Sequence, residues 1–244
     1  MSPLPVNLII FSTTMGHGGK HTYKECLDSL FGQLDSCLFA NKVLHLKSRE
    51  GEEDVANEIK LLCSNLAIRV IETKEEVVHW SENHLAHSAG YFKDIYRAYS
   101  DLEIRKQKYS LWLEDDWLFN SKICLEEAFK ESLEFLDDNP NQLCVRFNGA
   151  KGFFDPEGEY LVENGNILTQ AINYTKYGPT FTFQPNLSRT NEIFIAWKAA
   201  QAHLDKLGSY HCELMSGDLL KSMTDSKTPF SFFNTNRVYA QHIG

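Results

Sequence analysis

Three carboxylates stand side by side near the middle of the chain, directly after an apolar run. The run 109–113 (YSLWL) has the composition of a buried strand, and Glu114, Asp115 and Asp116 follow it. In open α/β sheets, ligands bind beyond the carboxyl ends of the strands. Adjacent carboxylates repel one another, and a hard cation such as Mg²⁺ or Mn²⁺ relieves that repulsion. This acidic triplet therefore predicts a divalent-cation site for a phosphorylated ligand. The alternative is a solvated acidic turn that caps a helix starting near Ser121.

The segments around the acidic triplet alternate between strand and helix patterns. Apolar runs of strand length occur at 6–11, 43–46, 67–71, 109–113 and 143–147. Apolar residues at helical spacing predict helices between them, at 23–34, 53–63, 85–102 and 125–136. Successive strand–helix units imply a mostly parallel sheet with helices on both faces. The sequence therefore predicts an α/β fold in which a central strand carries the acidic triplet.

The chain changes in texture after residue 148. Residues 149–185 are rich in Gly, Asn, Tyr, Phe and Thr, which favours short antiparallel strands, including one at 180–183. A loop at 184–189 and a helix at 191–206 follow, and another helix begins near 213. No linker rich in Pro, Gly or Ser divides the 244 residues, so we expect one domain.

Charge and hydropathy exclude several classes of protein. The net charge of −9 argues against a nucleic-acid-binding protein, which needs a basic face. No apolar stretch approaches the roughly 18 residues of a transmembrane helix, and the N-terminus (MSPLPVNLIIF) reads as a strand and not as a signal peptide. We expect a cytoplasmic protein, and peripheral contact with a membrane is compatible with the sequence.

The six cysteines show no metal-binding or redox spacing. A chain of this size needs no disulfides to stabilise its core, so reduced and mostly buried thiols are expected. The six residues are Cys26, Cys37, Cys63, Cys124, Cys144 and Cys212.

Three short motifs resemble glycosyltransferases of the GT-A fold. LWLEDDW at 111–117 is similar to the Asp-x-Asp-like motif of that fold, and HTYKECLDSLFGQ at 21–33 resembles the first helix of its family 2. The ending AQHIG at 240–244 is similar to the His-x-Gly-like end of metal-dependent members. The chain departs from the family at 44–54 (LHLKSREGEED), where the usual acidic-Gly-Ser signature is absent. The resemblance implies a nucleotide-sugar-binding half at 1–148 and an acceptor-binding half at 149–244.

The resemblance also assigns roles to the acidic triplet and the chain end. Asp116 would be the direct ligand of Mn²⁺ or Mg²⁺, while Glu114 and Asp115 would contact the ribose and the water molecules of the metal. His242 would complete the metal shell. The alternative for His242 is an ordinary solvated residue near the chain end.

Three hydroxyl residues follow the first predicted strand, where the GT-A fold places nucleotide contacts. They are Ser12, Thr13 and Thr14. The resemblance makes them substrate-binding residues. The alternative is a turn that caps the next helix.

An inverting transfer needs a carboxylate that takes the proton of the acceptor hydroxyl. The resemblance places this base at the start of a helix in the second half, which favours Glu213 over Asp218 in YHCELMSGDLL. Glutamate is also common at helix starts for electrostatic reasons. A retaining mechanism would need neither residue.

Taken with the acidic triplet, the resemblance to GT-A enzymes implies a metal-dependent, inverting glycosyltransferase. It would move a sugar from a UDP- or GDP-sugar to a hydroxyl of a glycan or lipid-linked acceptor. The loop 184–189, centred on Pro185, would help to shape the acceptor pocket. Two alternatives stay open: a non-catalytic nucleotide- or sugar-binding module of the same fold, and a nucleotidyltransferase. The second is disfavoured because the loop after the first strand carries only Lys20 as a basic residue other than histidine.

Overall fold

A computed structural model gives the fold of the chain. It describes residues 4–14, 21–74, 93–122, 124–140, 142–147, 163–164, 167–168, 185–195, 197–198, 231–235 and 239–243.

Four parallel strands form one side of a nine-stranded sheet. They are β1 (Leu4–Thr13), β2 (Phe39–Ser48), β3 (Arg69–Lys74) and β4 (Tyr109–Glu114). Their order is β3-β2-β1-β4, and each neighbouring pair is parallel. The chain therefore forms β2 and β3 on one side of β1 and then returns to place β4 on its other side.

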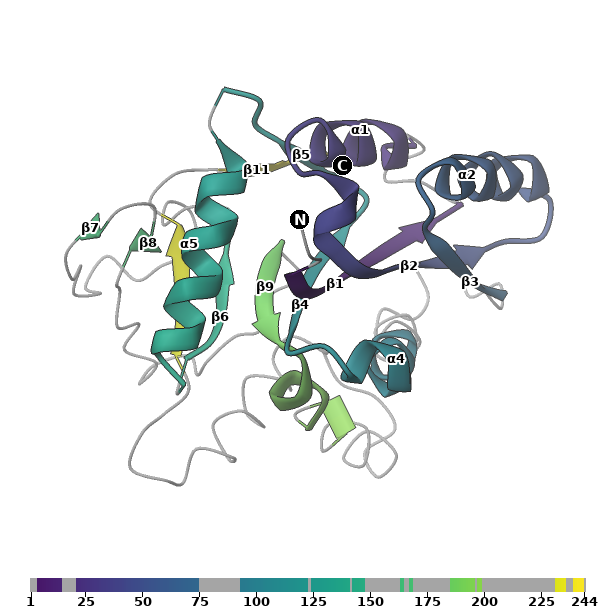
Figure 1. Cartoon of the computed structure of the whole chain (residues 1–244). Helices are drawn as coiled ribbons and strands as arrows, with labels where there is room; N and C mark the ends of the chain where they lie inside the picture. The colour runs from purple at the N-terminus through teal and green to yellow at the C-terminus, as the bar shows by residue number, and fades with distance from the viewer. Residues whose placement is uncertain are drawn as a thin grey trace, which may run out of the picture.

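The other side of the sheet mixes strand directions. β9 (Asn186–Arg189) runs antiparallel between β4 and β6 (Gln142–Arg146), and β10 (Ser231–Thr235) lies parallel to β6. The short strands β8 (Ile167–Leu168) and β7 (Glu163–Asn164) continue the sheet in antiparallel pairs. Since β9 opposes both β4 and β6, the strands β6 and β10 point the same way as β1. The predicted α/β fold, with a mostly parallel sheet and a smaller antiparallel part, is confirmed (Figure 1).

Helices cover one face of the sheet through alternating apolar residues. Leu8 and Ile10 of β1 share a buried core with α1 (Tyr23–Phe31), α2 (Glu53–Asn65) and α5 (Leu125–Asp138). Successive side chains of a strand point to opposite faces, so Ile9 and Phe11 of β1 face the opposite side of the sheet. Burial of the apolar faces of these helices stabilises the sheet at roughly 25 cal/mol per Å² of apolar surface.

Stacked aromatic rings line the opposite face of the sheet. His45 of β2 stacks on Phe11 of β1, with 5.0 Å between ring centroids, and Phe11 stacks on Trp112 of β4 at 4.4 Å. Trp112 stacks in turn on Tyr99, which belongs to the helical segment 93–100, at 5.9 Å. All four rings are buried. This aromatic ladder holds the helical segment against the three strands, so helices cover both faces as predicted.

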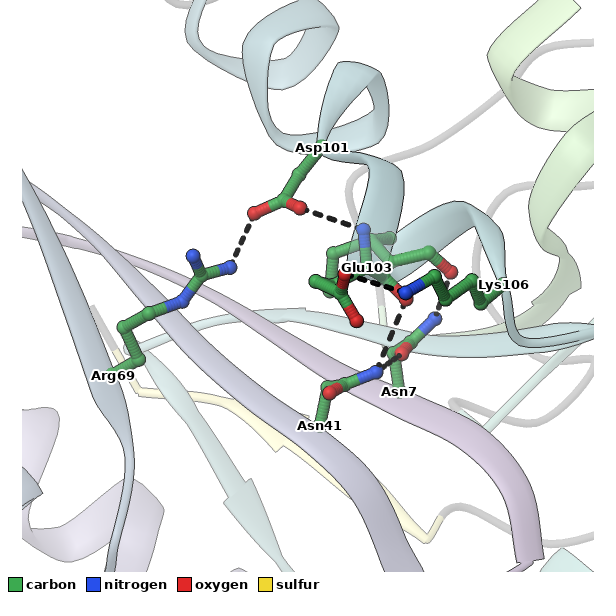
Figure 2. A network of polar contacts seen from close by, with 7 residues as sticks. Asn7, Asn41, Arg69, Asp101, Glu103 and Lys106 are labelled. Carbon is green, nitrogen blue, oxygen red and sulfur yellow. Dashed lines mark hydrogen bonds and ion pairs between the residues drawn. The ribbon is translucent and has the colours of Figure 1, made fainter.

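A polar network fixes α4 (Leu102–Arg105) to the amino ends of the strands (Figure 2). The side chain of Asn7, fully buried in β1, donates from Nδ2 to the main-chain oxygen of Ile104 at 2.8 Å. Asp101 accepts a hydrogen bond from Arg69 of β3 and also caps α4. Each buried polar group in this network therefore has a partner, which offsets its desolvation.

The acidic triplet is followed by a strand and not by a helix. β5 (Trp117–Phe119) pairs antiparallel with β11 (Ala240–His242) in a separate two-stranded ribbon. α5 begins only at Leu125, with Cys124 at its N-cap position. The alternative of a solvated acidic turn that caps a helix near Ser121 is therefore wrong, since Asp115 and Asp116 are buried and no helix begins there. The sequence around β5 does not reveal this strand, because its partner β11 lies more than a hundred residues away in the chain.

The predicted loop 184–189 is also wrong in the residues that the structure describes. Residues 186–189 form β9, a buried strand inside the sheet. The polar side chains of this segment are typical of a loop, but in the structure they are buried and form hydrogen bonds. Arg189 donates to the main-chain oxygens of Leu136 and Gln142, at the end of α5 and the start of β6. Ser188 donates to the main-chain oxygen of Ser110 at 3.4 Å.

Other predicted boundaries shift by a few residues. β3 begins at Arg69 and not at residue 67, because Ala67 adopts φ 52° at the end of α2. There the amide of Ile68 donates to the main-chain oxygen of Cys63 at 2.8 Å, a common helix stop. The predicted strand 180–183, the helix near 213 and the end of the helix 191–206 lie outside the described residues.

The described cysteines are all free thiols. Cys26, Cys63 and Cys144 are buried, whereas Cys37 and Cys124 are exposed. Cys212 lies outside the described residues. None of the helices in the described part of the chain combines the length and apolarity that crossing a membrane requires.

Candidate functional site

The candidate site lies where the strand order reverses. β1 and β4 are parallel neighbours, and Phe11 is opposite Glu114 near their carboxyl ends. The chain leaves β1 towards β2 on one side, while β4 lies on the other. In open α/β sheets, this kind of switch point opens a crevice beyond the carboxyl ends of the strands. Both Ser12 and the acidic triplet sit at this edge.

Ser12 and Asp115 bridge the ends of the two strands. The hydroxyl of Ser12 donates to Oδ2 of Asp115 at 2.5 Å. The amide of Asp115 also donates to the main-chain oxygen of Phe11 at 2.9 Å. Both side chains are buried. The structure therefore brings together two of the predicted substrate-binding residues, and Asp115 is held with one fixed orientation.

Asp116 and His242 form the second pair at this edge. Nε2 of His242 lies 2.7 Å from Oδ2 of Asp116, although 126 positions separate the two residues. The amide of Ile243 donates to the main-chain oxygen of Asp116 at 2.8 Å. The carboxylate of Asp116 is 3 % exposed, whereas the imidazole is 54 % exposed. The two predicted metal ligands thus lie side by side, with the imidazole open to solvent.

The β5–β11 ribbon positions His242. Register pairs His242 with Trp117, the residue after the acidic triplet. The imidazole also contacts the Trp117 ring edge-on, with 5.4 Å between centroids. The backbone of β11 is therefore fixed by strand pairing, and the histidine is held at Asp116 by the ribbon and not by the triplet alone.

A buried thiol lies beneath the acidic triplet. Cys26 of α1 contacts the main-chain oxygen of Glu114, with Sγ at 3.7 Å. Burial, followed by the charge of nearby Asp115, raises the pKa of the Cys26 thiol well above its ordinary value. Cys26 is thus a neutral packing residue and no nucleophile. The side chain of Glu114 itself is half-buried at the end of β4.

Thr14 belongs to a neighbouring cluster and not to the triplet. Its hydroxyl donates to Oε2 of Glu52 at 2.5 Å and accepts from the amide of Arg49 at 3.0 Å. Thr14 therefore joins the ends of β1 and β2. Thr13 is half-buried and lies opposite Lys47 of β2 in the register. The hydroxyl of Thr14 is thus engaged by Glu52 and Arg49 at the ends of β1 and β2.

Glu52 and Arg49 were missed as candidate residues. Both follow the second strand, in the segment 44–54 that departs from the family pattern. A signal was available in principle, because the ends of parallel neighbours meet at one edge of the sheet. The two candidate bases, Glu213 and Asp218, lie outside the described residues.

The donor set at Asp116 fits a divalent cation that also binds a ligand. No group of three or more metal-binding side chains occurs among the residues that the structure describes. Mg²⁺ sites with phosphate ligands commonly use only one or two protein groups, and phosphate oxygens and water complete the shell. Nε2 of His242 and Oδ2 of Asp116 are at hydrogen-bond distance, 2.7 Å. A cation that replaced the shared proton would need them to separate only slightly, because adjacent ligands in an octahedral shell lie about 3.0 Å apart. The carboxylate of Asp116 suits Mg²⁺ and Mn²⁺ alike, and the imidazole of His242 favours a transition metal over Mg²⁺.

Comparison with known proteins assigns no family. No protein-family model matches the chain, and no curated protein matches its sequence. Among solved structures, the chain is similar to a mannose-1-phosphate geranyltransferase from Thermus thermophilus. The two are 14 % identical, the match covers 98 % of this chain and 76 % of that one, and the TM-score is 0.47. A likeness of that extent assigns no activity.

Proposed function

We propose that the protein is a metal-dependent glycosyltransferase. It transfers a sugar from a nucleotide-sugar donor, a UDP- or GDP-sugar, to a hydroxyl of a glycan or lipid-linked acceptor. The donor occupies the crevice between the ends of β1 and β4, with its diphosphate at the acidic triplet. The acceptor binds towards the half formed by residues 149–244.

The contact between Asp116 and His242 carries this proposal. The sequence singled out both residues as metal ligands, and their ligating atoms lie 2.7 Å apart. A buried carboxylate next to an exposed imidazole, at the switch point of an α/β sheet, suits a cation that reaches out to a ligand. The reaction class comes from the resemblance to GT-A enzymes of the two motifs that contain these residues, LWLEDDW at 111–117 and AQHIG at 240–244.

Different residues at the ends of β1 and β4 would bind different parts of the donor. Asp116 and His242 would hold Mn²⁺ or Mg²⁺, whose charge stabilises the leaving nucleoside diphosphate. Asp115, oriented by Ser12, is positioned to accept hydrogen bonds from the ribose or from metal-bound water. Glu114 is the last residue of β4, where its half-buried carboxylate could do the same.

The transfer itself needs a base on the acceptor side. The acceptor oxygen forms a bond to the anomeric carbon as the bond to the diphosphate oxygen breaks, and the hydroxyl proton passes to a carboxylate. We assign that carboxylate to Glu213, with Asp218 as the second choice. This arrangement inverts the configuration at the anomeric carbon.

The test is donor binding with and without Mn²⁺. We would measure melting temperature against UDP-, GDP-, CMP- and dTDP-sugars, because a ligand that binds only the folded state raises it. The wild type should respond to one nucleotide class and only with metal, and Asp116→Asn should lose that response. Asp138→Asn, which changes an exposed carboxylate on α5, is the matched control. A metal-dependent response that survives in Asp116→Asn would refute the assignment of the triplet.

Turnover separates the proposal from its two alternatives. A glycosyltransferase releases nucleoside diphosphate from a nucleotide sugar, whereas a nucleotidyltransferase joins a nucleoside triphosphate to a sugar phosphate and releases pyrophosphate. A non-catalytic module binds without turnover. Release of pyrophosphate, or binding without any turnover of the bound donor, would contradict the proposal.

A further inference from the structure

Helix α1 lies beside the β5–β11 ribbon that carries His242 (Figure 1). Two of its side chains, Cys26 and Ser29, are three positions apart and therefore lie on one face of the helix. Cys26 is fully buried, and Ser29 is half-buried. Both side chains contact main-chain groups of the segment that begins with the acidic triplet. Helix α1 thus contacts this segment through hydrogen bonds as well as through apolar packing.

The hydroxyl of Ser29 binds the main chain of β5. It accepts a hydrogen bond from the amide of Phe119 at 3.0 Å and donates to the main-chain oxygen of Cys26 at 2.9 Å. The next amide, that of Asn120, donates to the main-chain oxygen of Tyr239 at 2.8 Å, on the side of β11. Successive amides of an antiparallel strand point to opposite edges. The edge of β5 that faces away from β11 is therefore held by α1.

The thiol of Cys26 contacts the main chain on both sides of the two buried aspartates. Its Sγ lies 3.7 Å from the main-chain oxygen of Glu114, to which the protonated thiol donates. Burial raises the pKa of this thiol, and a hydrogen bond from the main chain of Trp117 opposes that rise. Glu114 precedes Asp115 in the chain, and Trp117 follows Asp116. Cys26 therefore holds both ends of the turn that contains the aspartates.

The β5–β11 ribbon depends on its attachments to the rest of the fold. Its two strands have three residues each, and an isolated pair of strands is marginally stable in water. On the β11 side, the amides of Tyr239 and Ala240 donate to the main-chain oxygen of Phe147, directly after β6, at 2.8 and 3.0 Å. On the β5 side, the ribbon is attached to the two side chains of α1. The placement of Asp116 against His242 therefore depends on both attachments.

We propose that Cys26 and Ser29 are positioning residues that hold Asp116 and His242 at the separation that a shared cation needs. Both act through the main chain of residues 114–119 and not by binding the cation. Their role in cation binding rests on the proposed function, whereas the attachment of the ribbon to α1 can be measured without metal. Ser29→Ala is the variant of choice, because alanine is the stronger helix former and α1 itself should stay intact.

The test compares Ser29→Ala with two control variants of the full chain. Ser29→Thr keeps the hydroxyl, which in a helical threonine can also bond the main-chain oxygen of the preceding turn. Gln33→Ala is the matched control, because Oε1 of Gln33 accepts from the amide of Leu125 at 3.4 Å, at the start of α5 and outside the ribbon. Each alanine variant thus removes one side-chain acceptor of a main-chain amide. Melting temperatures check that every variant folds.

The first measurement is amide hydrogen exchange by NMR without metal. The amides of Asn120 and Ile243 form hydrogen bonds of the ribbon and report on its opening, and that of Thr190, at the other end of β4, serves as the reference. Ser29→Ala should speed exchange of the two ribbon amides about three- to tenfold relative to the reference, the range expected for one hydrogen bond. Ser29→Thr and Gln33→Ala should leave this ratio unchanged. An unchanged ratio in Ser29→Ala would overturn the proposal.

The second measurement is the Kd of Mn²⁺ alone by calorimetry. Ser29→Ala should raise the Kd about three- to tenfold, Ser29→Thr should restore it, and Gln33→Ala should bind as the wild type does. Equal weakening in Ser29→Ala and Gln33→Ala would overturn the proposal, because the loss would then follow general stability. Failure of the proposed metal site is seen in the wild type, as absence of Mn²⁺ binding, whereas failure of the positioning role is seen in the variants.

Discussion

The buried imidazole of His45 should make the fold sensitive to acid. Burial, followed by the positive charges of Arg69 and Arg97, lowers the pKa of His45 from 6.5 to about 4, and Asp101 opposes the shift without cancelling it. The ring is 5 % exposed and stacks in the aromatic ladder, and its Nδ1 has no hydrogen-bond partner among the described residues. Protonation in the folded state is therefore unfavourable.

The sign and size of the effect follow from linkage. The unfolded chain binds a proton at His45 below about pH 6.5, whereas the folded chain does so only near pH 4. The stability that a neutral His45 provides is complete above pH 6.5 and is lost as the pH falls towards 4. The free energy of unfolding should drop by about 2 kcal/mol at pH 5 and about 3 kcal/mol at pH 4 from this residue.

The assay compares the wild type with His45→Phe by urea denaturation between pH 7.5 and pH 4. Phenylalanine keeps a stacked ring but does not titrate, so the titration of other groups cancels in the difference. The variant should gain stability relative to the wild type by about 3 kcal/mol across this range. A difference between the two proteins that does not change with pH would refute the reasoning.

Three further predictions concern the base, the metal ligand and the backbone. Glu213→Gln should lower turnover by roughly 10² to 10⁴ with donor affinity nearly unchanged; in steady-state and binding assays, that pattern in Asp218→Asn would show that the wrong carboxylate was chosen. His242→Ala should weaken Mn²⁺-dependent donor binding in calorimetry and leave metal-free binding unaltered, because the variant loses one metal ligand. Unchanged Mn²⁺-dependent binding would show that His242 is only a solvated residue. Ala67→Gly should raise the free energy of unfolding by about 0.5–1 kcal/mol, because the left-handed backbone at φ 52° is unfavourable for alanine; an unchanged or lower stability in urea titrations would contradict this.

Much of the first half of the fold could be predicted because its signals are local. The apolar runs in β1 and β4 and the helical spacing in α1, α2 and α5 reflect burial against one large core. The residues at the ends of β1 and β4 could be chosen as site candidates for a related reason. Parallel strands end at the same edge, so Ser12 and Asp115 had to lie close together.

The features that were missed depend on distant partners. β5 has three residues and exists because it pairs with β11. β9 contains Asn186, Ser188 and Arg189, which read as a loop until their buried hydrogen bonds are known. No periodicity in a segment of three or four residues can reveal such pairing.

For the site, too, the sequence predicted which strand ends meet but not which side chains contact each other there. The sequence indicated Thr14 as a neighbour of the donor, but its hydroxyl bonds to Glu52 at the start of α2. A side chain at the end of β1 can turn towards the end of β2 or towards the end of β4. Its rotamer and the geometry of the loop decide between the two, and the spacing of residue types predicts neither.

The most direct test of the central claim is the nitrogen coordination of bound Mn²⁺. Pulsed electron paramagnetic resonance of the Mn²⁺ complex, formed with the nucleoside diphosphate identified in the thermal-shift panel, detects an imidazole nitrogen on the metal. The wild type should show this coupling, His242→Ala should lose it, and Asp116→Asn should bind Mn²⁺ more weakly. Bound Mn²⁺ without the nitrogen coupling, or a coupling that persists in His242→Ala, would contradict the assignment of Asp116 and His242 as the metal site.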